Sequence, residues 1–157
     1  MIRIFGVGNV LLCDDGIGVK VCQCIKEKFK SYKSIKFIIG ETDLLYCLDY
    51  IEDMTSNDIA VIIDSTCFEN IPGKVTLKSF KECDEFINMS FESHSETLLK
   101  VLRRDYRYIN GYLIGIEISK IDYSLDLSVE LTNKFDDICN CVSKTIENIV
   151  NNKSHVN

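Results

Sequence analysis

The chain has 157 residues, of which 46% are hydrophobic and 27% charged, and its formal net charge is −6. This length and balance predict one globular domain, long enough to bury a sizeable core. We expect the domain to span residues 1–150 and a flexible tail to span 151–157. The acidic charge excludes nucleic acid as a partner, because phosphate binding needs basic patches. No apolar run approaches the roughly 20 residues that span a bilayer, which excludes a membrane protein. The apolar N-terminal stretch meets Asp14 and Asp15 too early for a secretory signal, so we expect a cytoplasmic protein. We also expect it to be a monomer.

Eight cysteines raise the alternatives of a disulfide framework or a zinc site. No two of them are spaced as Cys-x-x-Cys, the spacing that structural zinc sites usually show. We therefore expect free thiols, packed as small hydrophobic side chains in a reducing compartment.

Strands and helices alternate along the chain, as the spacing of the apolar residues indicates. Residues 16–29 have a helical period, and residues 59–63 form a continuous apolar run typical of a strand buried on both faces. Ser93-x-x-Glu96 has the pattern of a capping box that opens a helix. The strands are expected at 2–7, 35–39, 59–63, 74–80 and 112–116, and the helices at 16–29, 44–51, 93–104 and 128–150.

This order of elements predicts a three-layer α/β/α sandwich with a mostly parallel sheet. The segment 65–72 is too short for a helical crossover, so the fourth strand is expected to run antiparallel to the third. In such sheets ligands bind beyond the carboxyl ends of the strands.

The first turn of the chain carries the most specific signal, because the first strand runs into Gly6-Val7-Gly8-Asn9 and two carboxylates, Asp14 and Asp15, follow. A dinucleotide-binding turn would need a third glycine where Leu11 stands, and positive potential where the two aspartates stand. The acids indicate a cationic ligand instead.

Three side chains that can bind a metal are expected at the ligand-binding edge of the sheet. Asp15 follows the first strand, Asp64 follows the third, and His94 lies in the first turn of the helix before the fifth. Two carboxylates and an imidazole suit a borderline divalent cation such as nickel or zinc. Each residue also has a simpler explanation: Asp15 as a helix cap, Asp64 as a loop cap and His94 as a solvated side chain.

The same segments, in order and over nearly the whole chain, resemble the hydrogenase maturation proteases. The matching residues are Gly6-Val7-Gly8-Asn9 with Asp14-Asp15-Gly16, Ile62-Ile63-Asp64, Ser93-His94 and Leu113-Ile114-Gly115-Ile116-Glu117.

The resemblance implies a phosphorylase/hydrolase-like fold with a five-stranded sheet of order 2-1-3-5-4, strand four reversed. It also implies an endopeptidase that trims the C-terminal extension of the large-subunit precursor of a [NiFe] hydrogenase after nickel insertion. The family's metal-contacting positions fall on Asp15, Asp64 and His94. The resemblance also implies that the nickel comes from the substrate. The isolated chain could hold another divalent cation.

Three positions differ from the family pattern. The second acid of the opening motif, more often Glu, is Asp15, and Ile118 stands where the family often has proline. Where the family tends to have Gly-Gly-Thr, this chain has Gly40-Glu41-Thr42. Glu41 and Glu117 both fall at the expected ligand edge, and we assign them to substrate binding together with Gly8 and Asn9.

The sequence lacks a His-Glu-x-x-His zinc motif and a Gly-x-Ser-x-Gly elbow. We therefore expect Asp15 and Asp64 to be the catalytic residues, with the attacking water activated by a carboxylate or by the metal. Two alternatives stay open. One is a cysteine peptidase that uses Cys13 or Cys67 near His94, and the other is a non-catalytic metal- or peptide-binding module of the same fold.

Overall fold

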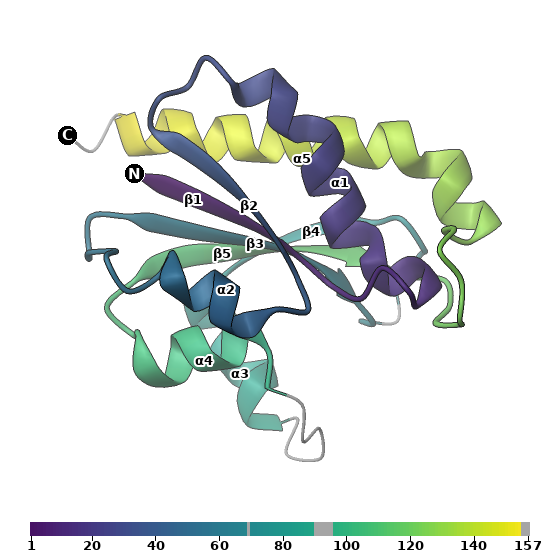
Figure 1. Cartoon of the computed structure of the whole chain (residues 1–157), viewed down its shortest axis with the longest axis horizontal. Helices are drawn as coiled ribbons and strands as arrows, with labels where there is room; N and C mark the ends of the chain where they lie inside the picture. The colour runs from purple at the N-terminus through teal and green to yellow at the C-terminus, as the bar shows by residue number, and fades with distance from the viewer. Residues whose placement is uncertain (69, 90–95, 155–157) are drawn as a thin grey trace.

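The computed structural model describes residues 1–68, 70–89 and 96–154. It contains a five-stranded sheet with the order β2-β1-β3-β5-β4, in which β4 alone is antiparallel to its neighbour (Figure 1). The predicted order and the reversed strand are both confirmed. The strands are β1 (Ile2–Val7), β2 (Ile35–Glu41), β3 (Ile59–Thr66), β4 (Val75–Ser79) and β5 (Asn110–Glu117).

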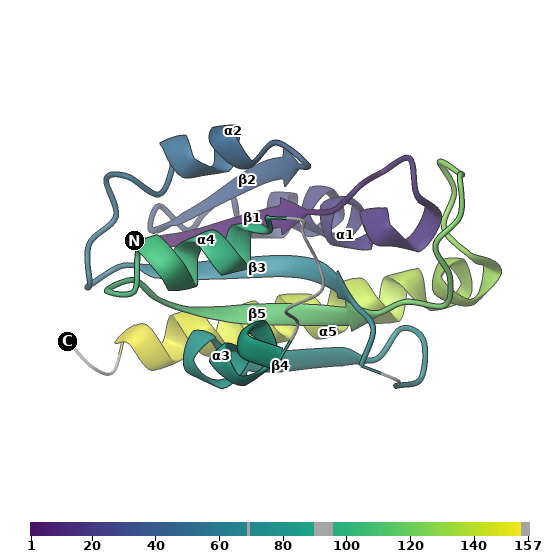
Figure 2. The same cartoon turned by 90° about the horizontal axis from the view of Figure 1, so that it is seen from below.

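Helices cover both faces of this sheet, which gives the predicted three layers. Figures 1 and 2 show α1 and α5 on one face and α2, α3 and α4 on the other. The helices are α1 (Ile17–Ile25), α2 (Leu44–Asp49), α3 (Phe80–Met89), α4 (Leu98–Asp105) and α5 (Val129–Ser154), and two 3₁₀ segments, η1 (Cys13–Gly16) and η2 (Lys26–Phe29), flank α1. Helix α5 continues past Val150, the expected end of the domain. No helix in these described ranges is long and apolar enough to cross a membrane.

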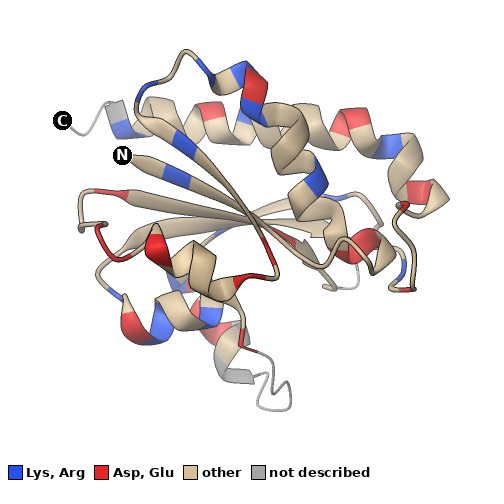
Figure 3. Cartoon of the chain, in the orientation of Figure 1, with Lys and Arg blue, Asp and Glu red and all other residues tan. Residues whose placement is uncertain are grey.

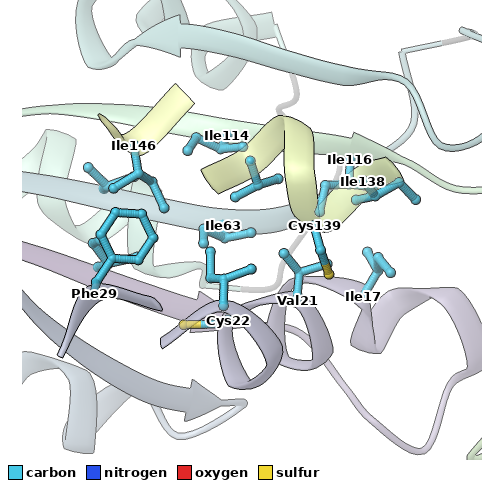
Figure 4. Packing of buried hydrophobic residues seen from close by; sticks show 14 of the residues in the cluster. Ile17, Val21, Cys22, Phe29, Ile63, Ile114, Ile116, Ile138, Cys139 and Ile146 are labelled. Atoms are coloured by element: carbon cyan, nitrogen blue, oxygen red, sulfur yellow. The ribbon is translucent and has the colours of Figure 1, made fainter. Parts of the chain in front are cut away.

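Each face of the sheet has its own hydrophobic core, because successive side chains of a strand point to opposite faces. In β3, Val61 and Ile63 pack with α1 and α5, whereas Ala60 and Ile62 pack with α2, α3 and α4. Figure 4 shows the first of these cores, where side chains of α1, β3, β5 and α5 interdigitate. All eight cysteines are free thiols, as expected, and five of them are buried.

Helix α1 lies directly against the sheet at the ends of β1 and β3. A Cβ atom on Gly18 would lie 2.3 Å from the carbonyl oxygen of Ile63 and 2.6 Å from that of Val7. Only glycine permits this approach, and it brings the segment before α1 to the carboxyl ends of both strands.

Helix α3 was not predicted, and α4 begins later than expected. Ser79 and Glu82 form a capping box at the start of α3: the Ser79 N–H donates to Glu82 Oε2 over 2.7 Å, and the Glu82 N–H donates to Ser79 Oγ over 3.4 Å. Ser93 of the expected capping box lies outside the described residues, and the helix expected to include Glu96 begins only at Leu98. Its N-cap is Thr97, whose hydroxyl accepts a hydrogen bond from the Lys100 N–H over 3.3 Å.

Candidate functional site

An open cavity of about 440 Å³ lies beyond the carboxyl ends of β1, β2 and β3. Its lining includes five carboxylates and, among the described residues, no Lys, Arg or His. Acidic residues gather at this end of β2 and at the start of α2 in Figure 3. The lining residues are Val7, Gly8, Asn9, Asp15, Glu41, Thr42, Asp43, Leu44, Cys47, Asp64, Ser65, Glu96, Thr97 and Leu98.

Asp15 reaches the cavity from η1 and is fixed on both of its carboxylate oxygens. The Asn9 N–H donates to Oδ2 over 2.9 Å, and the Ser65 hydroxyl donates to Oδ1 over 2.8 Å. The loop can close this way because Gly8 has a φ of +128°, and a Cβ there would lie 2.0 Å from the carbonyl oxygen of Asp15. Gly8 and Asn9 therefore shape the site through their backbone.

Asp64 reaches the same cavity from within β3, where it is paired with Gly115 of β5. The Ser65 N–H donates to Asp64 Oδ1 over 2.8 Å. Burial raises the pKa of Asp64 to about 7; this hydrogen bond opposes the shift and the charge of Asp15 adds to it. The structure thus brings together Asp15 and Asp64, which are far apart in sequence, with one carboxyl that titrates near neutrality.

Asp14 has no part in this site, although it precedes Asp15. Its carboxylate is fully buried and accepts backbone hydrogen bonds from Ser128 (2.7 Å), Ser119 (3.0 Å) and Lys120 (3.1 Å). Burial alone would raise its pKa, but these hydrogen bonds hold the pKa below its usual value. Asp14 anchors the connection between β5 and α5.

The two glutamates that we assigned to substrate binding have different positions. Glu41 is exposed, lines the cavity and has a φ of 48°, which is unusual for a residue other than glycine. Glu117 is buried and does not line the cavity. Both of its carboxylate oxygens accept the Phe68 N–H, over 2.9 and 3.0 Å, and one also accepts the Asn70 N–H over 3.0 Å. The structure therefore makes Glu117 an anchor for the loop after β3, away from the cavity, and its assignment to substrate binding stays an untested prediction.

His94 lies outside the described residues. Glu96, two positions later, lines the cavity and forms an ion pair with Arg104 of α4. Within the described ranges, no three His, Cys, Asp or Glu side chains form a metal-binding group by themselves.

The lining also contains residues that the sequence did not single out. Ser65 is the most informative, because it contacts both aspartates; its place next to Asp64 was a signal that could have identified it. Cys47 also lines the cavity, but burial, with a smaller contribution from Asp43, raises the pKa of its thiol to about 11. Cys13 and Cys67, the cysteines considered as nucleophiles, are not in the lining.

No family model matches the chain. A Methanocaldococcus jannaschii protein assigned to the hydrogenase maturation proteases is 29% identical over 154 residues, which cover 93% of this chain and 88% of that protein. The Escherichia coli hydrogenase 2 maturation protease is 26% identical over 102 residues, which cover 64% of this chain and 60% of that protein.

Two solved structures share the fold. The E. coli hydrogenase maturating endopeptidase HybD superposes with a TM-score of 0.72 at 20% identity and covers 94% of this chain and 92% of its own. The [NiFe] hydrogenase maturation protease HybD of Thermococcus kodakarensis superposes with a TM-score of 0.66 at 23% identity. The match covers 92% of this chain and 97% of that protein.

Proposed function

The chain belongs to the hydrogenase maturation protease family, and we propose that it removes the C-terminal extension of a [NiFe] hydrogenase large-subunit precursor after nickel insertion. The observation that carries this proposal is the pair Asp15 and Asp64, which reaches one acidic cavity from η1 and β3. Anionic oxygens at the ends of two adjacent elements suit a cation, and here the cation is the nickel that the precursor already holds.

In this proposal the nickel is part of the substrate and serves as its recognition mark. Asp15 and Asp64 supply two oxygen ligands, and His94 supplies an imidazole nitrogen, a ligand type that nickel accepts well. His94 is separated by one residue from Glu96, which lines the cavity, and this supports including it. Binding at these residues positions the scissile bond of a nickel-loaded precursor, so that metal insertion precedes cleavage.

The carboxyl of Asp64 is suited to move a proton in this reaction. The pKa of about 7 is that of the chain without metal; nickel bound to Asp64 lowers this pKa, so the carboxylate is ionised and can accept the proton of the attacking water. The water oxygen attacks the scissile carbonyl carbon, and the proton then held by Asp64 passes to the departing amine. Asp15, hydrogen bonded by two donors, holds the metal end of the substrate.

The polypeptide itself is expected to lie along the cavity wall. Gly8 and Asn9 line the cavity next to Glu41, the last residue of β2, whose carbonyl oxygen accepts the Gly8 N–H over 3.1 Å. Glu41 is exposed there, so its carboxylate is available to the residues of the precursor that flank the scissile bond.

The deciding experiment compares nickel-loaded with nickel-free precursor, with the products identified by mass spectrometry. We expect a single cleavage near the C-terminus of the loaded precursor and none of denatured casein. Asp15→Asn, Asp64→Asn and His94→Gln should leave the loaded precursor uncleaved, whereas the control Asp137→Asn, on the exposed side of α5, should process it normally.

Three results would contradict the proposal in different ways. Cleavage of nickel-free precursor at the same rate as nickel-loaded precursor would show that the enzyme does not recognise its substrate through the metal. Binding of the precursor without turnover would indicate a non-catalytic module. Inactivation of the folded chain by thiol alkylation would indicate a cysteine peptidase.

A further inference from the structure

Ser65 is hydrogen bonded to both carboxylates of the proposed site. Its backbone N–H donates to Asp64 Oδ1 and its hydroxyl donates to Asp15 Oδ1, each over 2.8 Å. One residue therefore links two carboxylates that come from different elements of the fold.

Successive side chains of β3 point to opposite faces of the sheet, which explains why a residue next to Asp64 can reach Asp15. Ile63 points to the core under α1 and α5, and Ile62 to the core of the opposite face. Asp64 therefore continues the Ile62 face and Ser65 the Ile63 face. Asp15 approaches from η1, on the α1 side of the sheet, where the Ser65 hydroxyl meets it.

We propose that Ser65 is a positioning residue whose hydroxyl holds the Asp15 carboxylate beside Asp64, so that both can bind one cation. This inference rests on the proposed function. Each carboxylate oxygen has two acceptor sites, so Asp15 retains free lone pairs after accepting from Asn9 and Ser65. Without the hydroxyl, the Asn9 N–H is the one hydrogen bond to this carboxylate that the described residues retain, and the carboxylate can then rotate about its Cβ–Cγ bond.

The test uses three variants of the full chain. Ser65→Ala removes the hydroxyl and keeps the backbone N–H that contacts Asp64. Ser65→Thr keeps a hydroxyl at this position, and threonine is a residue that is common in strands. Ser143→Ala is the control, because it removes a serine hydroxyl away from the site, which is buried and donates to the Cys139 carbonyl over 2.8 Å within α5.

Two readouts do not depend on proteolysis. In crystals of the Ser65→Ala protein we expect the Asp15 carboxylate to turn away from its wild-type position. By titration calorimetry with Ni²⁺ alone we expect affinity to fall by about tenfold or more, the usual effect of removing a residue that orients a metal ligand. Ser65→Thr should recover the affinity, and Ser143→Ala should keep it.

An unchanged Asp15 carboxylate in Ser65→Ala would overturn the positioning role. Ni²⁺ binding by the wild type no tighter than by Asp15→Asn would overturn the claim that the pair is held for a cation. Failure of the wild type to process loaded precursor, with both readouts as expected, would instead reject the proposed function and leave the role of Ser65 standing.

Discussion

Asp14 and Asp15 are consecutive residues whose carboxylates face different parts of the molecule. Asp14 Oδ1 accepts the Ser128 N–H over 2.7 Å inside the fold, whereas Asp15 Oδ2 accepts the Asn9 N–H over 2.9 Å at the wall of the cavity. The opening motif thus combines one carboxylate that stabilises the fold with one that is available to a ligand.

Asp14→Asn should therefore destabilise the protein far more than Asp15→Asn. The introduced amide would direct its N–H donors at backbone N–H groups. We therefore expect the free energy of unfolding to fall by about 3 kcal/mol in Asp14→Asn, against about 1 kcal/mol or less in Asp15→Asn. Urea unfolding at pH 7 measures both. Because the pKa of Asp14 is lowered in the folded state, its stabilisation is complete above the unfolded value of about 3.9 and is lost as the pH falls below it. Equal losses in the two variants would contradict this division of roles.

Asp64 should have the opposite effect on the pH dependence of stability. Its pKa is raised to about 7, so the folded state binds more protons than the unfolded state between about pH 4 and pH 7. Stability contributed by this group is therefore present below pH 4 and is lost as the pH rises to 7. Asp64→Asn should remove this dependence, so the variant gains stability relative to wild type across that window. A constant difference in Tm between the two proteins from pH 4 to pH 8 would show that Asp64 does not titrate there.

Glu41→Gly should stabilise the protein and alter its substrate preference. Glu41 has a φ of 48°, a conformation that glycine adopts without strain. The control Glu41→Ala removes the same carboxylate and keeps the strain, so the glycine variant should be more stable than the alanine variant by about 1 kcal/mol in thermal unfolding. Both variants should show the same change in KM for the precursor, because both lack the charge. A change in KM confined to one of them would assign the effect to the backbone.

Cys13→Ser should leave processing largely intact. Cys13 is buried, its sulfur lies 3.7 Å from Asp14 Oδ1, and it does not line the cavity. Single-turnover cleavage of loaded precursor provides the measurement. The variant's folding should be checked first by circular dichroism, since the substitution is internal. A folded but inactive Cys13→Ser protein would make this thiol part of the reaction.

The sequence by itself determined the main elements and the two aspartates of the site. Alternating strands and helices with long apolar runs leave few arrangements of the sheet, and the short connection after β3 excludes a parallel β4. Asp15 and Asp64 could be placed at one edge because the carboxyl ends of adjacent parallel strands meet there.

Only the tertiary structure decided which of several similar sequence patterns caps a helix or faces the cavity. Two Ser-x-x-Glu patterns occur, and the one at Ser79 opens a helix while Thr97 caps the next, because packing selects where each helix begins. Glu41 and Glu117 are the last residues of β2 and β5, yet the loop after β3 folds over Glu117 and buries it. Likewise, the link from Ser65 to Asp15 depends on the close approach of α1 to β3 at Gly18, a contact between distant segments that no local pattern encodes.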